Sequence, residues 1–209
     1  MVSQDLLGII RILKVEGWFT IEEYNFALEN LELKGGQASD RPQRVPENSK
    51  AKRLVGKAIS IWVHVRNWPF IMKNFVKDKN NKALVLGYML QEIVERICSP
   101  QFRECDICIL EEKIVAYIDL RTEVHLQNLH LLTRATPKTH FMTHYPHQIS
   151  RFGPLINVWT ARFESRHRLA KSTAESGNWK MWLVTVVTKS GNNLNFYFDF
   201  AQSKIFDYM

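Results

Sequence analysis

The sequence predicts a mainly α-helical domain, a helical bundle, whose C-terminal tail could add a β-hairpin. Apolar residues recur at helical spacing in most segments between positions 3 and 172. Neither an internal repeat nor an alternating strand–helix pattern is found. With 209 residues, of which 45% are hydrophobic, the chain can bury a core in one domain. We therefore expect a helical domain over 1–180 and a divergent tail over 181–209, either hairpin or disordered.

The first helix is expected over residues 3–15, with Ser3 or Asp5 as its start signal. A second helix should follow from about 20 to 31, because Thr20 and Glu23 have the spacing of a capping box. Its flanking pair, Phe19 and Tyr24, has the spacing of a hydrophobic staple.

Residues 33–50 should be an exposed loop, because they are rich in Gly, Pro, Ser and charge. Val45 is the one core residue expected there. The apolar segment 54–75 should be helical and kinked or split at Pro69.

Two longer helices are expected next, over 82–98 and 105–132, with Ser99-Pro100 between them. The inward stripe of the second would be Ile109, Leu110, Ile114, Val115, Ile118 and Leu126.

The C-terminal third should hold a short helix after Pro137 and a helix over about 155–172. The tail then alternates β-branched and aromatic residues around the turn signal Gly191-Asn192. We expect strands at 182–187 and 194–200, or disordered coil, in place of helix.

The charge balance favours a polyanionic partner. Lys and Arg number 28 against 21 Asp and Glu, a net charge of +7. Segment 34–57 alone holds seven cations and two acids. No apolar run approaches the length of a membrane span and no signal peptide is recognisable, so DNA is the expected partner and a membrane is not.

Cysteines and histidines leave a zinc module open as a weaker alternative. Cys105 and Cys108 could be half of a zinc site, but no second such pair follows, and two buried thiols on a helix are favoured. His140, His144 and His147 would share one side of a helix, yet buried, hydrogen-bonded histidines around Tyr145 are favoured over a metal site.

The most basic segment, GPLINVWTARFESRHRLAK, carries a single acid, Glu164. With the residues before it, HFMTHYPHQISRFGPLINVWTARFESRHRLAK resembles the end of CACTA (En/Spm-like) DNA transposases and their uncharacterised animal relatives. Gly-Pro, Trp159, Phe-Glu and Lys171 fall at the family's spacings. The stretches GWFTIEEYN, LVGKAISIW and ICSP resemble the same relatives, so the likeness covers about residues 3–180.

The resemblance implies the helical insertion of an RNase H-like transposase, in which two Asp and one Glu hold two divalent metals. It matches Glu164 to that metal-binding Glu, with Mg²⁺ or Mn²⁺ as cofactors only in a complete enzyme. Cations beside such a site would contact DNA phosphates. These are Arg151, Arg162, Arg166, Arg168 and Lys171. The opposing interpretation of Glu164 is a simple helical pair with Arg168.

The chain also departs from that family. None of its aspartates has the context of a buried strand, and Met1 follows directly after the place where the family carries an acidic stretch. We therefore expect a transposase fragment or remnant that is inactive alone, needs no cofactor alone, and binds DNA without sequence preference, in the nucleus or alternatively the cytoplasm. A domesticated helical module is the alternative: it would bind a partner protein, or a second copy of itself, around Trp62 and Trp68.

Overall fold

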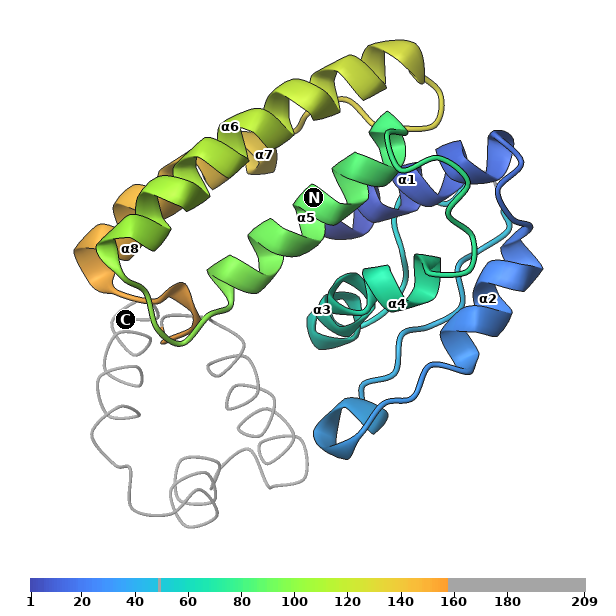
Figure 1. The fold of residues 1–209 in the computed structure, drawn as a ribbon, viewed down its shortest axis with the longest axis horizontal. Coiled ribbons are helices and arrows are strands. Elements are labelled where there is room, and N and C mark those ends of the chain that lie inside the picture. Colours follow the sequence, from blue (N-terminus) through green and yellow to red (C-terminus); the bar gives the residue numbers. More distant parts are fainter. Residues whose placement is uncertain (49, 158–209) are drawn as a thin grey trace, which may run out of the picture. The chain divides into compact units, whose positions relative to one another are not determined.

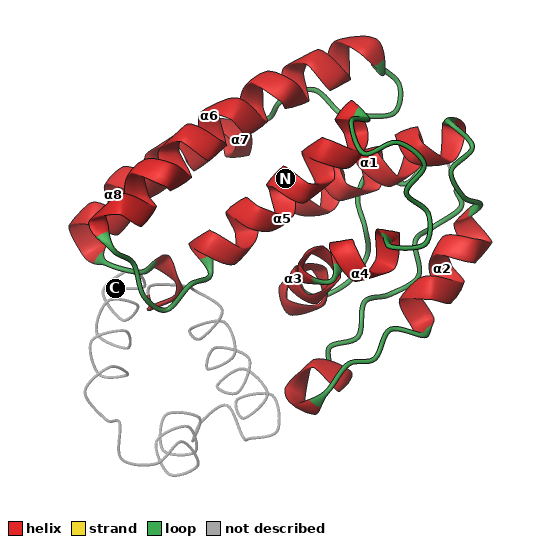
Figure 2. Cartoon of the chain, viewed as in Figure 1, coloured by secondary structure: helices red, strands yellow, loops and turns green. Residues whose placement is uncertain are grey.

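A computed structural model describes residues 1–48 and 50–157, and every regular element within them is helical (Figure 2). The predicted mainly α fold is therefore confirmed for this part of the chain. The short 3₁₀ turn Leu155–Asn157 ends it. The rest of the helix expected over 155–172, and the tail 181–209, lie outside the described residues.

Three helices carry most of the core (Figure 1): α1 (Val2–Val15), α5 (Lys82–Ile97) and α6 (Glu104–Gln127). α5 packs against both α1 and α6, and α6 packs in turn against α8 (Tyr145–Phe152). The predicted inward face of α1 is confirmed, because Leu6, Ile9, Ile10 and Leu13 are all buried. The proposed start signal is wrong: α1 begins at Val2, and Asp5 lies buried inside the helix.

The inward stripe predicted for α6 is only half right. Leu110 and Ile114 are buried, whereas Ile109, Val115 and Leu126 are exposed. The buried face continues instead through Tyr117, Arg121 and Val124. The sequence pattern did not indicate that Arg121 is buried, because its charge is neutralised by Asp5 on another helix. α6 also ends earlier than predicted, at Gln127, so that the following turn can bury Leu132.

α2 (Ile21–Glu29) begins as its sequence predicts. The Glu23 carboxylate accepts from the Thr20 backbone N–H at 2.7 Å, and the Glu23 N–H donates to the Thr20 hydroxyl at 3.2 Å. The Phe19 and Tyr24 rings pack at 5.1 Å between centroids, which confirms the staple.

The segment after α2 is irregular apart from a 3₁₀ turn at Gly35–Ala38, as expected for an exposed loop. The Asn25 side chain anchors it at Val45. The amide of Asn25 accepts from the Val45 N–H at 2.7 Å and donates to the Val45 carbonyl at 3.1 Å. Val45 is 2% exposed, which confirms it as a core residue of this loop.

The apolar segment after the loop is split in two, α3 (Ala58–Arg66) and α4 (Trp68–Met72). Pro69 opens α4, where its missing N–H leaves no helical hydrogen bond unmade. Trp68 is completely buried against α5. A Cβ added to Gly87 would lie 2.7 Å from Trp68 Nε1, so this glycine permits the close approach.

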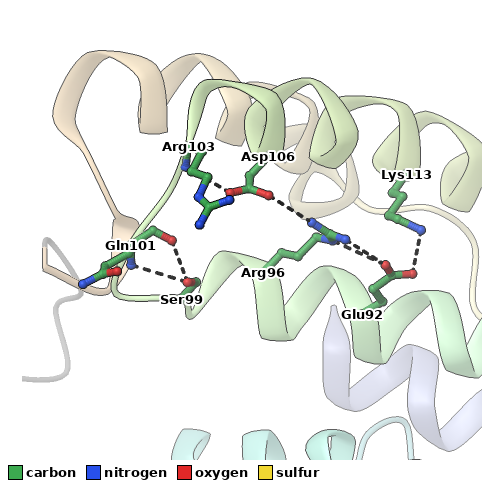
Figure 3. A network of polar contacts seen from close by, with 7 residues as sticks. All are labelled: Glu92, Arg96, Ser99, Gln101, Arg103, Asp106 and Lys113. Carbon is green, nitrogen blue, oxygen red and sulfur yellow. Dashed lines mark hydrogen bonds and ion pairs between the residues drawn. The ribbon is translucent and has the colours of Figure 1, made fainter.

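A polar network joins the end of α5 to the start of α6 (Figure 3). Glu92 accepts from Lys113 at 2.7 Å and from Arg96 at 3.1 Å. The Asp106 carboxylate accepts from the Arg103 backbone N–H at 3.0 Å, which caps α6. The Glu92–Lys113 contact and the Arg96–Asp106 ion pair at 3.9 Å join α5 to α6.

The last described helices follow each other closely: α7 (Pro137–Phe141), the 3₁₀ turn Met142–His144, and α8. Each of the two α-helices has proline in its first turn, where the missing N–H leaves no helical hydrogen bond unmade. Gly153 ends α8 with a φ of 75°, a conformation that favours glycine.

Candidate nucleic-acid interface

Of the site residues predicted from the resemblance, the structure describes Arg151 alone. Glu164, Arg162, Arg166, Arg168 and Lys171 lie outside the described residues. Arg151 is exposed in the last turn of α8, with its guanidinium carbon 5.1 Å from the centroid of the Phe152 ring. Its exposure leaves it accessible to an anion, and its role in DNA binding stays a prediction.

We define a basic patch as Lys50, Lys52, Arg53 and Lys57, which lie between α2 and α3 in the sequence, together with Lys138 of α7. All five side chains are exposed. Within the part of the chain that the structure describes, none of them forms an ion pair. The patch therefore presents positive charge that no carboxylate of residues 1–48 and 50–157 pairs with.

The backbone under the patch is held by the core. Leu54 is 4% exposed, and its N–H donates to the Ser3 carbonyl at the start of α1 at 3.1 Å. Arg11 donates to the carbonyl of Asn48 at 2.8 Å, which ties the preceding turn to the same helix. These two hydrogen bonds attach the chain at Asn48 and at Leu54 to α1.

Lys138 reaches the patch from a distant segment, the first turn of α7. Burial lowers the pKa of the Met1 amino group; the Asp5 carboxylate raises it, and the positive charges of Lys138, Arg121 and Arg53 lower it. Lys138 and Arg53 therefore both lie near the N-terminal end of α1. The charge count of segment 34–57 indicated the loop part of this patch, whereas nothing local could have indicated Lys138.

Two other cations of the loop are already engaged. Arg44 pairs with Glu29 at 3.4 Å, both exposed, and Arg41 donates to the Glu29 carbonyl at 2.7 Å. These contacts attach the loop to the end of α2. Among the described cations of segment 34–57, they leave Lys34 and the loop part of the basic patch exposed and without an ion pair.

The described carboxylates offer no metal centre. Asp5 accepts from Arg121 at 2.7 and 3.1 Å and from the Tyr117 hydroxyl at 2.9 Å. Both of its oxygens therefore already accept hydrogen bonds inside the core. Over residues 1–48 and 50–157, no three His, Cys, Asp or Glu side chains lie together as a metal would require.

The histidine and cysteine expectations were wrong in their burial. His140, His144 and His147 are exposed, and so are Cys105 and Cys108. Both groups sit on outward-facing turns, because the neighbouring apolar residues take the inward positions. The buried histidine is His64, which sequence reasoning missed: its Nε2 lies 2.8 Å from the Tyr24 hydroxyl.

A second surface feature lies between α2 and α4, a groove of about 970 Å³. Phe26 and Phe70, each 69% exposed, form its apolar walls. Glu22, Glu23 and Glu32 line it, and among the described residues no Lys or Arg does. This groove is therefore apolar and acidic in a chain that is basic overall. The sequence also predicted a partner-binding surface around Trp62 and Trp68. That prediction is wrong in part, because Trp68 is completely buried.

Comparisons with family models, curated proteins and solved structures found no match to this chain. In the described part of the chain, the helices are too short or too polar to cross a bilayer.

Proposed function

We propose that this chain is a DNA-contacting, helical part of a transposase-like protein, and that it binds duplex DNA through the basic patch without reading base sequence. One observation carries the proposal: five exposed cations form no ion pair within the described residues, and two of them, Arg53 and Lys138, lie near the start of α1. Lys and Arg side chains of this kind contact phosphates, which are the same in every sequence. A nuclear location follows from such a role.

The test is DNA affinity as a function of salt, measured by fluorescence anisotropy on a labelled duplex of random sequence. We expect the triple variant Lys52→Gln, Arg53→Gln, Lys57→Gln to bind more weakly. Each lost phosphate contact also reduces the slope of log K against log[salt] by about 0.9, so the slope should fall by about 2–3.

The matched control is Lys14→Gln, Lys73→Gln, Lys79→Gln, which removes the same charge. All three residues are exposed. Lys14 lies in the last turn of α1, about 20 Å from the helix start by the rise of an α-helix. The control should keep most of the affinity. Equal losses in the two variants would show that net charge alone attracts DNA, and no binding at low salt would end the proposal.

A second candidate function rests on the groove between α2 and α4. We propose as its occupant a basic amphipathic helix of a partner protein. Its apolar face would cover Phe26 and Phe70, and its cations would face the three glutamates. A second copy docking groove to groove is disfavoured, because carboxylates would meet carboxylates.

This candidate is tested with two labelled helical peptides that carry leucine on one face and either lysine or glutamate on the other. The lysine peptide should bind the full chain more tightly, and Phe26→Ser with Phe70→Ser should weaken it. The control pair is Phe141→Ser with Phe152→Ser, which are 57% and 60% exposed on other elements. Equal binding of the two peptides, or equal effects of the two pairs, would contradict the groove as the docking site.

A further inference from the structure

Two histidine rings meet on the surface between α7 and α8. His140 and His144 are exposed, and their Nε2 atoms are 3.2 Å apart. The ring centroids lie 4.9 Å apart with the planes at 89°. We propose that this pair is a bidentate binding site for a borderline divalent metal ion such as Zn²⁺, Ni²⁺ or Cu²⁺.

The separation of the two nitrogens suits one shared ion. Metal–imidazole bonds are about 2.0–2.1 Å long, so an ion bonded to both Nε2 atoms would subtend about 100–106° at this separation. That angle is close to the tetrahedral value. The contact is a hydrogen bond in which one Nε2 donates to the other, so an ion bonded to both nitrogens would take the place of that shared proton.

Folding already holds the turn that carries the pair. Thr139 and Met142 are 3% and 1% exposed, so the residues beside and between the histidines are packed in the core. The Thr143 hydroxyl donates to the His140 carbonyl at 2.7 Å. Because the backbone is fixed before the metal arrives, binding loses little conformational entropy.

The donor set determines which ions fit. Neutral imidazole suits Zn²⁺, Cu²⁺ and Ni²⁺, whereas Mg²⁺ and Ca²⁺ select oxygen ligands. In the part of the chain that the structure describes, no third His, Cys, Asp or Glu completes the set. The ion would keep positions open to water or to a donor from a bound molecule. The site is thus distinct from the Mg²⁺ or Mn²⁺ centre that the resemblance implies.

The experiment is calorimetric titration of the full chain with NiCl₂ and with ZnCl₂, in a Cys105→Ser, Cys108→Ser background. The thiols are removed because both are exposed and would bind zinc themselves. We expect one ion per chain. His140→Ala and His144→Ala should each weaken binding at least about tenfold, since loss of a ligand should cost no less than loss of its supporting contacts. His147→Ala, also exposed, should leave it unchanged.

Electron paramagnetic resonance with Cu²⁺ provides an independent measurement. The background variant should show hyperfine coupling to two nitrogens, and either single histidine variant should show fewer. Circular dichroism establishes that each variant folds. Unchanged affinity in His140→Ala or His144→Ala would overturn the proposal, and so would a loss of binding in His147→Ala.

Discussion

At the scale of single residues, the core depends on one buried ion pair. Asp5 and Arg121 are 1% and 2% exposed and form two hydrogen bonds, while Tyr117 and the Thr133 carbonyl complete their partners. Burial opposes the charge of Arg121, but the Asp5 carboxylate raises its pKa overall. The pair joins α1 to α6 and thereby specifies how these helices face each other.

We expect Arg121→Met to lower the free energy of unfolding by about 3–5 kcal/mol, because Asp5 would keep a buried charge without a partner. The double variant Asp5→Leu, Arg121→Met should recover much of that loss, since no charge is then buried. Urea denaturation measures both. A cost below about 1 kcal/mol for the single variant would mean that water reaches Asp5.

His64 predicts a pH dependence of stability. Burial lowers its pKa from 6.5 to about 3, so the folded protein keeps it neutral while the unfolded chain binds a proton. Above pH 6.5 the neutral His64 does not reduce the free energy of unfolding. As the pH falls toward about 3, the unfolded chain alone binds a proton at His64, and the free energy of unfolding decreases. In this range the free energy of unfolding should change by up to about 1.4 kcal/mol per pH unit.

Urea midpoints between pH 4.5 and 7 provide the test of that slope. The variant His64→Gln should show a flatter dependence than the unmodified chain, and the exposed control His147→Gln should not. Parallel curves for the unmodified chain and His64→Gln would contradict a neutral, buried His64.

At the scale of elements, close approach decides the packing of α4 on α5. Gly87 lies inside α5, and the added Cβ would approach three ring atoms of Trp68 within 2.9 Å. Trp68 is completely buried and cannot swing away without moving its neighbours. A small residue at position 87 is therefore required by packing, even though glycine disfavours a helix.

We expect Gly87→Ala to destabilise the protein by about 1–3 kcal/mol through overpacking, although alanine is worth about 1 kcal/mol more than glycine in an open helix. Thermal unfolding measures the change. In a Trp68→Leu background the same substitution should become neutral or stabilising, which a double-mutant cycle reveals. If Gly87→Ala alone raised the thermal stability, Trp68 could not pack against position 87.

At the scale of the whole molecule, charge and catalytic chemistry are separate questions. The net charge of +7 supports contact with DNA, but every regular element of residues 1–48 and 50–157 is a helix. The aspartates of an RNase H-like site would need strands, and Asp5 is committed to Arg121. In the described part of the chain, Asp5 is therefore not available as a metal ligand, and the proposed role of this part is DNA contact.

We therefore predict that this chain neither nicks nor joins DNA in Mg²⁺ or Mn²⁺. Supercoiled plasmid incubated with the protein and either metal should remain supercoiled on a gel. Glu164→Gln is the matched variant, because Glu164 is the residue that the resemblance assigns to metal binding. Metal-dependent nicking that disappears in this variant would contradict the prediction.

Local sequence by itself determined the helices, the capping box of Thr20 and Glu23, the exposed loop and its excess of cations. These features depend on residues a few positions apart, so short windows contain the relevant interactions. Only the tertiary structure decided which face of α6 is buried, because Arg121 pairs with an aspartate 116 residues away. The exposure of His140 and His144, and the approach of Lys138 to the loop, were decided in the same way: each depends on neighbours supplied by distant segments.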